Sequence, residues 1–331
     1  MLRGCAGVSI PFLDPAQAES HRQNNYLHSL LLLGGIAATL ATGAYLLFGP
    51  YGIVAVFVSV AVLSLLAPQV PPALLMRLYR GRLHTPGRDQ LSLIVDELSA
   101  RAGLPARPQL YVIPSATLNA FATGSPRHSA IAVTEGLLRR MTLREIGGVI
   151  GHEVSHIRNN DLWLMNVADI MTRYVQIMSY VALYLAVTNL LAIAAGDRTV
   201  SWWGIALLYL APSVSSLLQL GLSRAREFDA DREGAMLTGD PLGLASALTR
   251  LDSSTGRFWE DFAFPVPARR TPQPSLLRTH PPTEERVAQL RAMVQQPALA
   301  PIAVVEEPML TMIGCGPIEL RPRYRFPGVW F

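Results

Sequence analysis

The segment Val149–Asp161, VIGHEVSHIRNND, contains two histidines four residues apart and a glutamate directly after the first. On an α-helix, residues four apart lie on one face about one turn from each other, so His152 and His156 can bind one metal ion together. Glu153 would lie beside that ion without binding it. The pattern H-E-x-x-H is typical of zinc hydrolases, in which the carboxylate takes the proton of zinc-bound water. Three fixed letters also occur by chance, so this interpretation needs a helix, a third ligand and a suitable compartment.

The residues before the motif predict that it lies on a helix. The helix is expected to begin at Thr142, because Glu145 follows three residues later and the pair forms a capping-box signature. Upstream, PQLYVIPSATLNAFATG and HSAIAVTEGLL are rich in Val, Ile, Tyr, Thr and Phe and flank the turn-forming TGSPRH. We therefore expect two β segments that form a hairpin, followed by the helix of the motif.

The composition indicates a membrane protein. Of the 331 residues, 50% are hydrophobic and only 16% are charged, well below the fraction usual in soluble domains. All 28 basic side chains are arginines, and they gather at the ends of apolar stretches rather than on one face among aromatic residues. We therefore expect no nucleic-acid partner. Cys5 and Cys315 lie at opposite ends of the chain, so no disulfide framework is expected.

Four apolar stretches are long enough to cross the hydrocarbon core of a bilayer, which takes about 20 residues. The sequence GPYG leaves room only for a tight turn between the first two, so residues 27–78 are predicted to form a transmembrane hairpin. Pro68, Pro71 and Pro72 indicate that the second span is kinked or ends near the membrane surface. Residues 169–222 are predicted to form a second hydrophobic hairpin, and whether it fully spans the bilayer stays open. The predicted spans are residues 27–48, 53–78, 169–195 and 202–222.

Two polar residues, Arg173 and Gln176, lie inside the third apolar stretch. Polar groups that face lipid are costly and often functional. We expect instead that this helix begins above the membrane and that the two side chains snorkel or face a neighbouring helix.

The distribution of arginine predicts the topology. Arginines precede the first span and follow the second and the fourth, whereas the turn between the first two spans carries no charge. Both termini and the polar segments are therefore expected on the cytoplasmic side. The predicted organisation is a cytoplasmic segment at 1–26, one cytoplasmic domain in two parts at 79–168 and 223–297, and a C-terminal extension at 298–331.

A candidate third ligand follows the last apolar stretch, in SRAREFDADREGAML. Glu227 and Asp231 are four residues apart and share a helix face. Glu227 could complete a His-His-Glu set, with Asp231 hydrogen-bonded to a ligand imidazole from behind. The alternative is an acidic, solvated helix face, and the segment taken alone favours that alternative.

Several motifs together resemble HtpX-like membrane zinc peptidases, relatives of the CAAX prenyl proteases. The resemblance covers residues 27–296, and it departs from the family pattern at Phe228, where Tyr is common, and at Thr283, where an aliphatic residue is usual. It implies an α+β fold, namely a zincin-like (gluzincin) cytoplasmic catalytic domain with a small β-sheet, plus about four transmembrane helices. The motifs, in the family's order, are NAFATG, AVTEGLL, HEVSHIRNND, SRAREFDAD and THPPTEERVAQL.

The resemblance also implies the site residues. One zinc ion per chain would be bound by His152, His156 and Glu227, with Glu153 as the catalytic base. His280 and Arg286 are implied as donors to the developing oxyanion, although a helix-capping role for His280 is equally compatible with the two prolines that follow it. An edge strand would pair with an extended substrate through its main chain. The residues of this strand are Asn119, Ala120, Phe121, Ala122 and Thr123.

The implied activity is that of a zinc metalloendopeptidase that cleaves misfolded or damaged membrane proteins as part of stress response and quality control. Its partners would be unfolded polypeptides and the lipid bilayer, and its location a bacterial-type inner membrane with the active site facing the cytoplasm. Two alternatives stay open, a CAAX-type processing protease and an inactive relative that binds unfolded membrane proteins without cutting them. The sequence predicts neither a specific substrate nor an oligomeric state.

Overall fold

The computed structural model describes residues 15–66, 72–85, 87, 89–196, 200–255 and 282–293, with the backbone of two short strands near the C-terminus. These residues fall into two compact units. The helical unit comprises residues 23–70 and 161–226, and the sheet unit consists mainly of residues 71–160 and 227–331.

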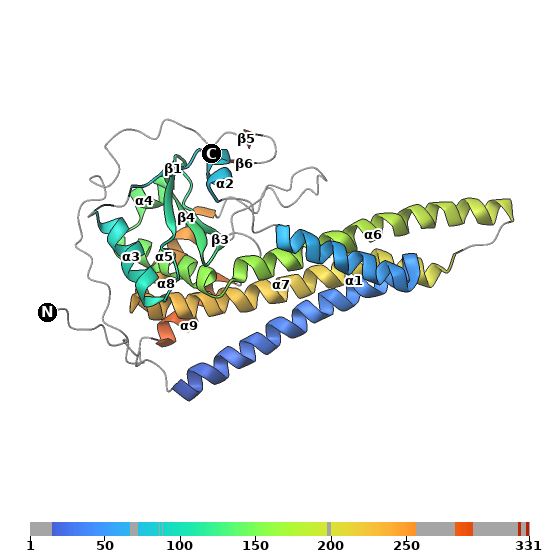
Figure 1. Ribbon diagram of the computed structural model, residues 1–331, viewed down its shortest axis with the longest axis horizontal. Coiled ribbons are helices and arrows are strands. Elements are labelled where there is room, and N and C mark those ends of the chain that lie inside the picture. The colour runs from blue at the N-terminus through green and yellow to red at the C-terminus, as the bar shows by residue number, and fades with distance from the viewer. Residues whose placement is uncertain are drawn as a thin grey trace. The chain divides into compact units, whose positions relative to one another are not determined.

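Nearly all described residues of the helical unit lie in three long helices, α1 (Pro15–Leu66), α6 (Asp161–Ala195) and the first part of α7 (Trp202–Thr238). All three are long and apolar enough to cross a membrane. Helix α1 consists of two segments that meet at Gly49, whose φ of 66° and ψ of −158° suit glycine almost exclusively. Figure 1 shows the chain of α1 reversing its direction there. The tight turn expected at GPYG therefore lies inside α1.

The second apolar stretch ends earlier than the sequence predicted. Helix α1 stops at Leu66 rather than continuing to Leu78. A separate short helix, α2 (Pro72–Leu78), belongs to the sheet unit, where Met76 is buried in a cluster with Tyr111. The physical reason is the group of prolines after Leu66, since proline cannot continue a helix but is well suited to begin one.

The other expected boundaries also shift. The helical unit begins at Asp161, where α6 starts, rather than at residue 169, and it ends at Arg226 inside α7 rather than at residue 222. Both helices run on past the apolar stretch into polar residues. Hydropathy therefore predicts only the part of each helix that suits a membrane.

Small side chains allow close packing in the helical unit. Ile36, Leu40 and Ala44 of α1 are fully buried in its hydrophobic core. A Cβ on Gly43 would lie 2.8 Å from the sulfur of Met178, so a larger residue here would require the Met178 side chain to shift. Such contacts are typical of membrane helices, because dispersion forces replace the hydrophobic effect there.

The polar residues inside α6 have partners on their own helix. The guanidinium of Arg173 pairs with Asp169 one turn earlier, at 2.7 Å, and is largely exposed. The amide nitrogen of Gln176 lies 3.0 Å from Ser179 Oγ. Both arrangements fit a supporting role for these side chains.

The sheet unit contains a four-stranded mixed sheet. Its strands are β1 (Arg82–Leu83), β2 (Gln109–Ile113), β3 (Ala120–Ser125) and β4 (His128–Thr134), in the order β1-β2-β4-β3. Strand β2 runs parallel to β4, whereas β3 and β4 form the expected antiparallel hairpin. The segment PQLYVIPSATLNAFATG was expected to form one β segment but contains two strands, because the residues between β2 and β3 leave the sheet. Strand β3 is an edge strand of this sheet.

Residues on the two faces of the sheet alternate, as in any pleated strand. Tyr111, Phe121 and Ala132 lie on the face that Met76 of α2 covers. The other face of β3 packs against α5 (Leu143–Arg158), the helix of the H-E-x-x-H motif. The sheet is therefore held between a short helix and the motif helix (Figure 1).

The motif helix begins as the sequence predicts. The hydroxyl of Thr142 accepts a hydrogen bond from the Glu145 N–H, and the Glu145 carboxylate accepts one from the Thr142 N–H, which completes the capping box. The remaining helices of the described sheet unit are α3 (Gln90–Arg101), α4 (Glu135–Arg140), α8 (Pro241–Thr255) and α9 (Thr283–Met293), and the short strands β5 (Tyr324–Arg325) and β6 (Val329–Trp330) pair with each other.

Helix α8 gives a first testable prediction. The Asp240 carboxylate caps α8 by accepting a hydrogen bond from the Gly243 N–H at 3.0 Å, and it also accepts one from Arg144 at 2.7 Å. Asp240→Ala is expected to cost about 0.5–2 kcal/mol of stability. Asp240→Asn keeps the cap and loses only a half-exposed ion pair, so it should cost less than about 1 kcal/mol. Thermal unfolding of the two variants in detergent checks this order.

The same pair predicts a pH dependence. Burial would raise the pKa of Asp240, but the hydrogen bonds from Arg144 and Gly243 outweigh it and hold the pKa below its ordinary value. A depressed folded-state pKa stabilises the fold above the unfolded-state value of about 3.9 and loses this effect as the pH falls through the folded-state value. The wild-type advantage over Asp240→Asn should therefore disappear in acid. An advantage that persists there would contradict the ion pair.

Candidate active site

The H-E-x-x-H residues lie in the part of α5 that is buried on all sides, from Glu145 to Ile157. His152 is 1% exposed, Glu153 is 0% exposed and His156 is 6% exposed. Helix α7 brings Glu227, which is also buried, to the same place. The three candidate ligand residues, far apart in the sequence, therefore converge where the sequence predicted.

Two glycines allow α5 and α7 to approach closely at this site. A Cβ on Gly234 would lie 2.7 Å from the backbone nitrogen of His152, and one on Gly151 would lie 3.1 Å from the carbonyl oxygen of Gly234. Any larger side chain would push the two helices apart. This contact, two turns after Glu227 on α7, brings the Glu227 carboxylate within reach of the histidines.

The distances within the group suit a zinc ion. His152 Nε2 and His156 Nε2 lie 3.2 Å apart, and the Glu227 carboxylate oxygens lie 3.5 and 3.6 Å from them. Tetrahedral zinc with bonds of about 2.0–2.2 Å separates its ligand atoms by about 3.3–3.6 Å. The donor set of two imidazoles and one carboxylate is also that of a catalytic zinc site. The residues present therefore fit the metal.

Asp231 lies directly behind His152. Its Oδ1 atom is 3.0 Å from His152 Nδ1, which leaves Nε2 directed at the candidate metal position. Burial would raise the pKa of Asp231, but the hydrogen bonds and positive charge of Arg286 outweigh it and hold the pKa below its ordinary value. Asp231 therefore stays ionised and can fix the orientation and tautomer of His152.

Arg286, which the resemblance implies as an oxyanion donor, is paired with Asp231 in the structure. It is only 3% exposed, and its Nε and Nη2 atoms donate to the two Asp231 oxygens at 2.5 and 2.6 Å. Its Nη2 atom also lies 3.4 Å from Glu227 Oε2. Burial would lower the pKa of Arg286, but Asp231 raises it above the ordinary value. The guanidinium therefore supports the ligand residues from behind.

Glu153 lies between α5 and the edge strand β3. Its Oε2 atom accepts a hydrogen bond from the Ala122 N–H at 2.8 Å. Its Oε1 atom is buried and has no hydrogen-bond partner among the residues that the structure describes. Burial raises the pKa of the Glu153 carboxyl above its ordinary value. An unpartnered oxygen with raised proton affinity is suited to act as a base.

The predicted substrate strand offers its main chain rather than its side chains. Asn119, Ala120, Phe121 and Ala122 are all buried, and Thr123 is half-buried. Because the Ala122 N–H points to Glu153, away from β4, the backbone groups of Ala120 and Ala122 line the free edge. The Asn119 Oδ1 atom is buried and unpartnered within the described part of the chain. His280, the other implied oxyanion donor, lies outside the described residues.

One supporting residue was missed in the sequence. The Glu233 carboxylate accepts hydrogen bonds from Ser155 at 2.5 Å, from Arg158 at 2.6 Å and from Asn159, and it thereby ties α7 to the end of α5. The available signal was its spacing, since Glu233 lies six residues after Glu227 in a helix already predicted to face the motif. Charged residues beside a ligand set are easily interpreted as a solvated face.

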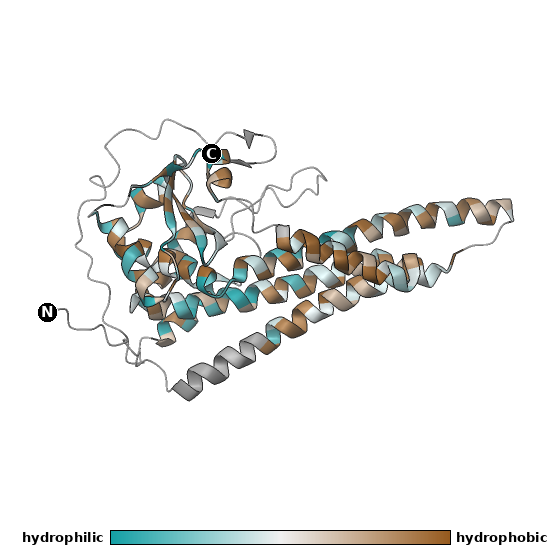
Figure 2. Cartoon of the chain, in the orientation of Figure 1, coloured by the Kyte–Doolittle hydropathy of each residue, from teal (hydrophilic) through white to brown (hydrophobic). Residues whose placement is uncertain are grey.

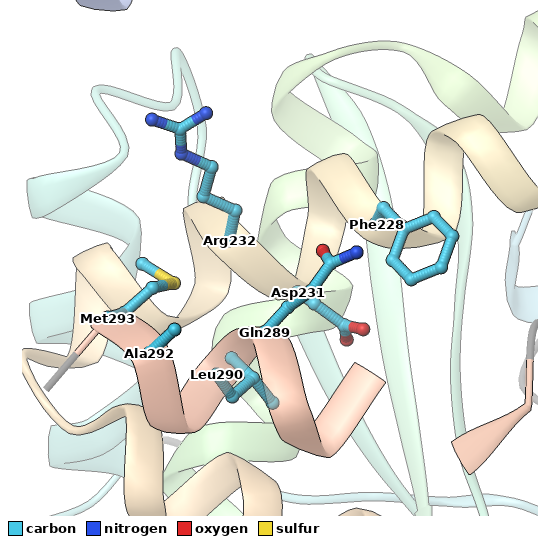
Figure 3. A pocket seen from close by; sticks show the side chains of 7 residues that line it. All are labelled: Phe228, Asp231, Arg232, Gln289, Leu290, Ala292 and Met293. Atoms are coloured by element: carbon cyan, nitrogen blue, oxygen red, sulfur yellow. The ribbon is translucent and has the colours of Figure 1, made fainter. Parts of the chain in front are cut away.

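A hollow of about 240 Å³ lies between α7 and α9, next to the ligand residues. Asp231 lines it from α7, and in Figure 3 the Asp231 carboxylate points toward α9. The Arg232 side chain points away from α9 in the same view. The complete lining consists of Phe228, Asp231, Arg232, Gln289, Leu290, Ala292 and Met293.

Comparisons with known proteins agree with this geometry. The family model described as "Peptidase family M48" matches residues 87–294. A protease HtpX homolog of Desulfatibacillum aliphaticivorans is 34% identical over 84% of this chain and 92% of its own length. A homolog of the same name from Acaryochloris marina is 36% identical over 82% of this chain and 96% of its own.

A solved structure was also found, the crystal structure of S. mikatae Ste24p. It is 20% identical, with a TM-score of 0.48, and the match covers 82% of this chain and 66% of that one. The family assignment rests on the sequence matches, which run through both the candidate ligand segments and most of the chain. By these matches, the chain belongs to peptidase family M48 and is a homologue of the HtpX proteases.

Proposed function

We propose that this protein is a membrane-integral zinc endopeptidase that cleaves misfolded or damaged membrane proteins. The observation that carries the proposal is the juxtaposition of His152, His156 and Glu227 with Glu153, directly beside an edge strand. A structural metal site would be closed by four protein ligands, whereas three ligands and a nearby unpartnered carboxylate are typical of hydrolysis.

Glu153 is proposed as the general base and acid. Zinc bound by the His-His-Glu set would lower the pKa of its water to about 7 and polarise the scissile carbonyl. The Glu153 Oε1 atom, which lacks a partner in the described structure, would take the proton from that water. The same carboxyl would then pass the proton to the leaving nitrogen.

The edge of β3 is proposed to align the substrate. An extended polypeptide can add to the free edge through the backbone groups of Ala120 and the carbonyl of Ala122, whose N–H is bound to Glu153. The Asn119 Oδ1 atom would accept a hydrogen bond from a substrate N–H. Recognition through the main chain makes little demand on the substrate's side chains, which suits an enzyme that acts on many unfolded proteins.

The enzyme is proposed to be a multi-pass protein of a bacterial-type inner membrane with four spans. The two segments of α1 would supply the first pair, and α6 and α7 the second pair. The arginine asymmetry favours cytoplasmic termini and a cytoplasmic active site. In a Cys5→Ser background, Cys315 should resist a membrane-impermeant thiol reagent in intact cells and react after the membrane is opened. Labelling in intact cells would overturn this topology.

Reconstitution tests the function. The purified protein in liposomes should degrade an unfolded membrane protein and an unfolded soluble polypeptide, and a chelator should abolish both activities until zinc is restored. An inactive relative would bind these substrates without producing fragments. A CAAX-type processing protease would release only a short C-terminal peptide from a prenylated substrate.

Metal analysis tests the ligand set separately. His156→Ala should reduce the zinc content from about one ion per chain to near zero, because two remaining ligands seldom retain zinc. The matched control is His128→Ala, which removes an exposed histidine outside the site. Near-stoichiometric zinc in the His156→Ala protein would rule out the ligand set.

A further inference from the structure

Helix α2 exposes apolar side chains on the face opposite the one that packs against the sheet. Leu74 is 52% exposed and Leu78 is 62% exposed, whereas Met76, on the opposite side of the helix, is fully buried against the sheet. Residues four apart share a helix face, so Leu74 and Leu78 lie next to each other. Figure 2 shows the predominance of hydrophobic colour on this short helix.

Cations accompany these leucines. Arg77 is exposed and lies one turn after Leu74, directly before Leu78 in the chain. Arg80 and Arg82 follow within five residues and are also exposed. Leucines interleaved with arginines are the pattern of a segment that lies at the surface of a membrane containing anionic lipids.

Chain continuity favours the same partner. Helix α2 begins at Pro72, only a few residues after α1 ends at Leu66, and α1 is a candidate membrane span. Even a fully extended connection of this length reaches only about 20 Å. An exposed apolar face within this distance of the end of a candidate membrane helix is within reach of the lipid headgroups.

The inner side of α2 contacts the proposed substrate strand. Met76 packs in one cluster with Phe121 of β3, and the ring of Tyr79, just after α2, lies 5.3 Å from the ring of Phe121. At the far end of β3, a Cβ on Gly124 would lie 3.1 Å from Pro72 Cγ. A shift of α2 would therefore also move β3, the strand that contacts Glu153.

We propose that Leu74, Arg77 and Leu78 form a membrane-surface contact that binds anionic lipid headgroups and the adjoining acyl chains. This contact holds the edge of β3 close to the bilayer. It rests on the proposed function and names the substrate class: extended segments of membrane proteins next to the membrane surface. Soluble unfolded polypeptides would reach the same edge without using the contact.

A site-directed probe tests the contact without requiring activity. In a background lacking both native cysteines, a polarity-sensitive fluorophore is attached to Leu78→Cys or, as the matched control, to Leu93→Cys on α3, which is 49% exposed. In liposomes with anionic lipid, nitroxide-labelled lipids should quench the probe at 78 and spare the probe at 93. Equal, weak quenching at both positions would overturn the proposal. A probe at 78 that is shielded from water but not quenched would also overturn it, because another protein segment or a second copy would then cover this face.

Proteolysis tests the consequence. Leu74→Ser with Leu78→Ser should lower cleavage of a membrane-anchored substrate, cut next to the bilayer, by about tenfold or more, since two leucines leave the lipid. Cleavage of a soluble unfolded polypeptide should be unchanged. Arg77→Gln should cost about fivefold on the anchored substrate in anionic liposomes and nothing in zwitterionic ones. Equal loss of cleavage on both substrates, or no loss on either, would contradict the proposed contact. A wild-type protein that cuts neither substrate would refute the proposed function, and the fluorescence result would still test the contact.

Discussion

Glu153→Gln is expected to lower kcat by about 10²–10⁴-fold, the usual contribution of a general base. The change is nearly isosteric, and the glutamine carbonyl can still accept the hydrogen bond from the Ala122 N–H. The variant should therefore fold and bind zinc as the wild type does. Only the proton acceptor at the unpartnered Oε1 position is lost.

The measurement combines turnover, zinc content and melting temperature on one preparation. The matched control is Glu284→Gln, which removes an exposed carboxylate from α9 and should leave all three quantities unchanged. Turnover of Glu153→Gln within a few-fold of wild type, at full zinc occupancy, would exclude Glu153 as the base. If neither the wild type nor Glu153→Gln turned over substrate, the protein would instead be an inactive relative that binds unfolded proteins without cutting them.

The inactive variant should also retain unfolded substrates. Glu153 is not a predicted zinc ligand, and the β3 edge does not change, so main-chain pairing with the substrate persists. Crosslinking from β3 in the Glu153→Gln protein should therefore capture uncut polypeptide.

Local signals explain what the sequence predicts well. The capping box at Thr142, the β3–β4 hairpin and the i,i+4 histidines each depend on residues within about one turn of helix or one tight turn. No local signal identifies Glu227 as a ligand, because two long helices separate it from the motif in the sequence. The resemblance to a known family predicted its role.

Long-range contacts explain what the sequence did not predict. The parallel pairing of β2 with β4 leaves no local pattern, since it depends on which segments meet after the chain has turned. The end of α1 at Leu66 was ambiguous because leucine-rich α2 continues the apolar composition beyond the prolines. The role of Arg286 was inferred from its motif, and a motif does not reveal that the guanidinium faces Asp231.

Arg286→Ala is expected to destabilise the sheet unit by about 3–5 kcal/mol and to weaken zinc binding about 10–100-fold. The first effect arises because Asp231, only 3% exposed, would keep a buried charge with no cation beside it. The pKa of Asp231 would then rise, since burial alone favours the neutral form. A protonated or displaced Asp231 no longer fixes His152, which accounts for the second effect.

An oxyanion donor would behave differently. Its removal would lower kcat by about 10²–10³-fold with normal zinc affinity, normal stability and little change in KM. Melting temperature and zinc affinity, measured beside kcat and KM on Arg286→Ala, therefore distinguish the two roles. The control is Arg291→Ala, which removes an exposed arginine from the same helix and should change none of these quantities.

A double-mutant cycle makes the assignment specific to the pair. Asp231→Asn removes the buried charge, so the further change Arg286→Gln should then cost much less stability than it does in the wild type. The expected coupling is large, about 1.5 kcal/mol or more, because the two groups share two short hydrogen bonds out of contact with solvent. Arg286→Lys keeps the charge but cannot form the two-pronged pair, so it should recover part of the zinc affinity. Additive losses of stability in the cycle, together with full zinc affinity in Arg286→Ala, would instead favour the role of Arg286 as an oxyanion donor.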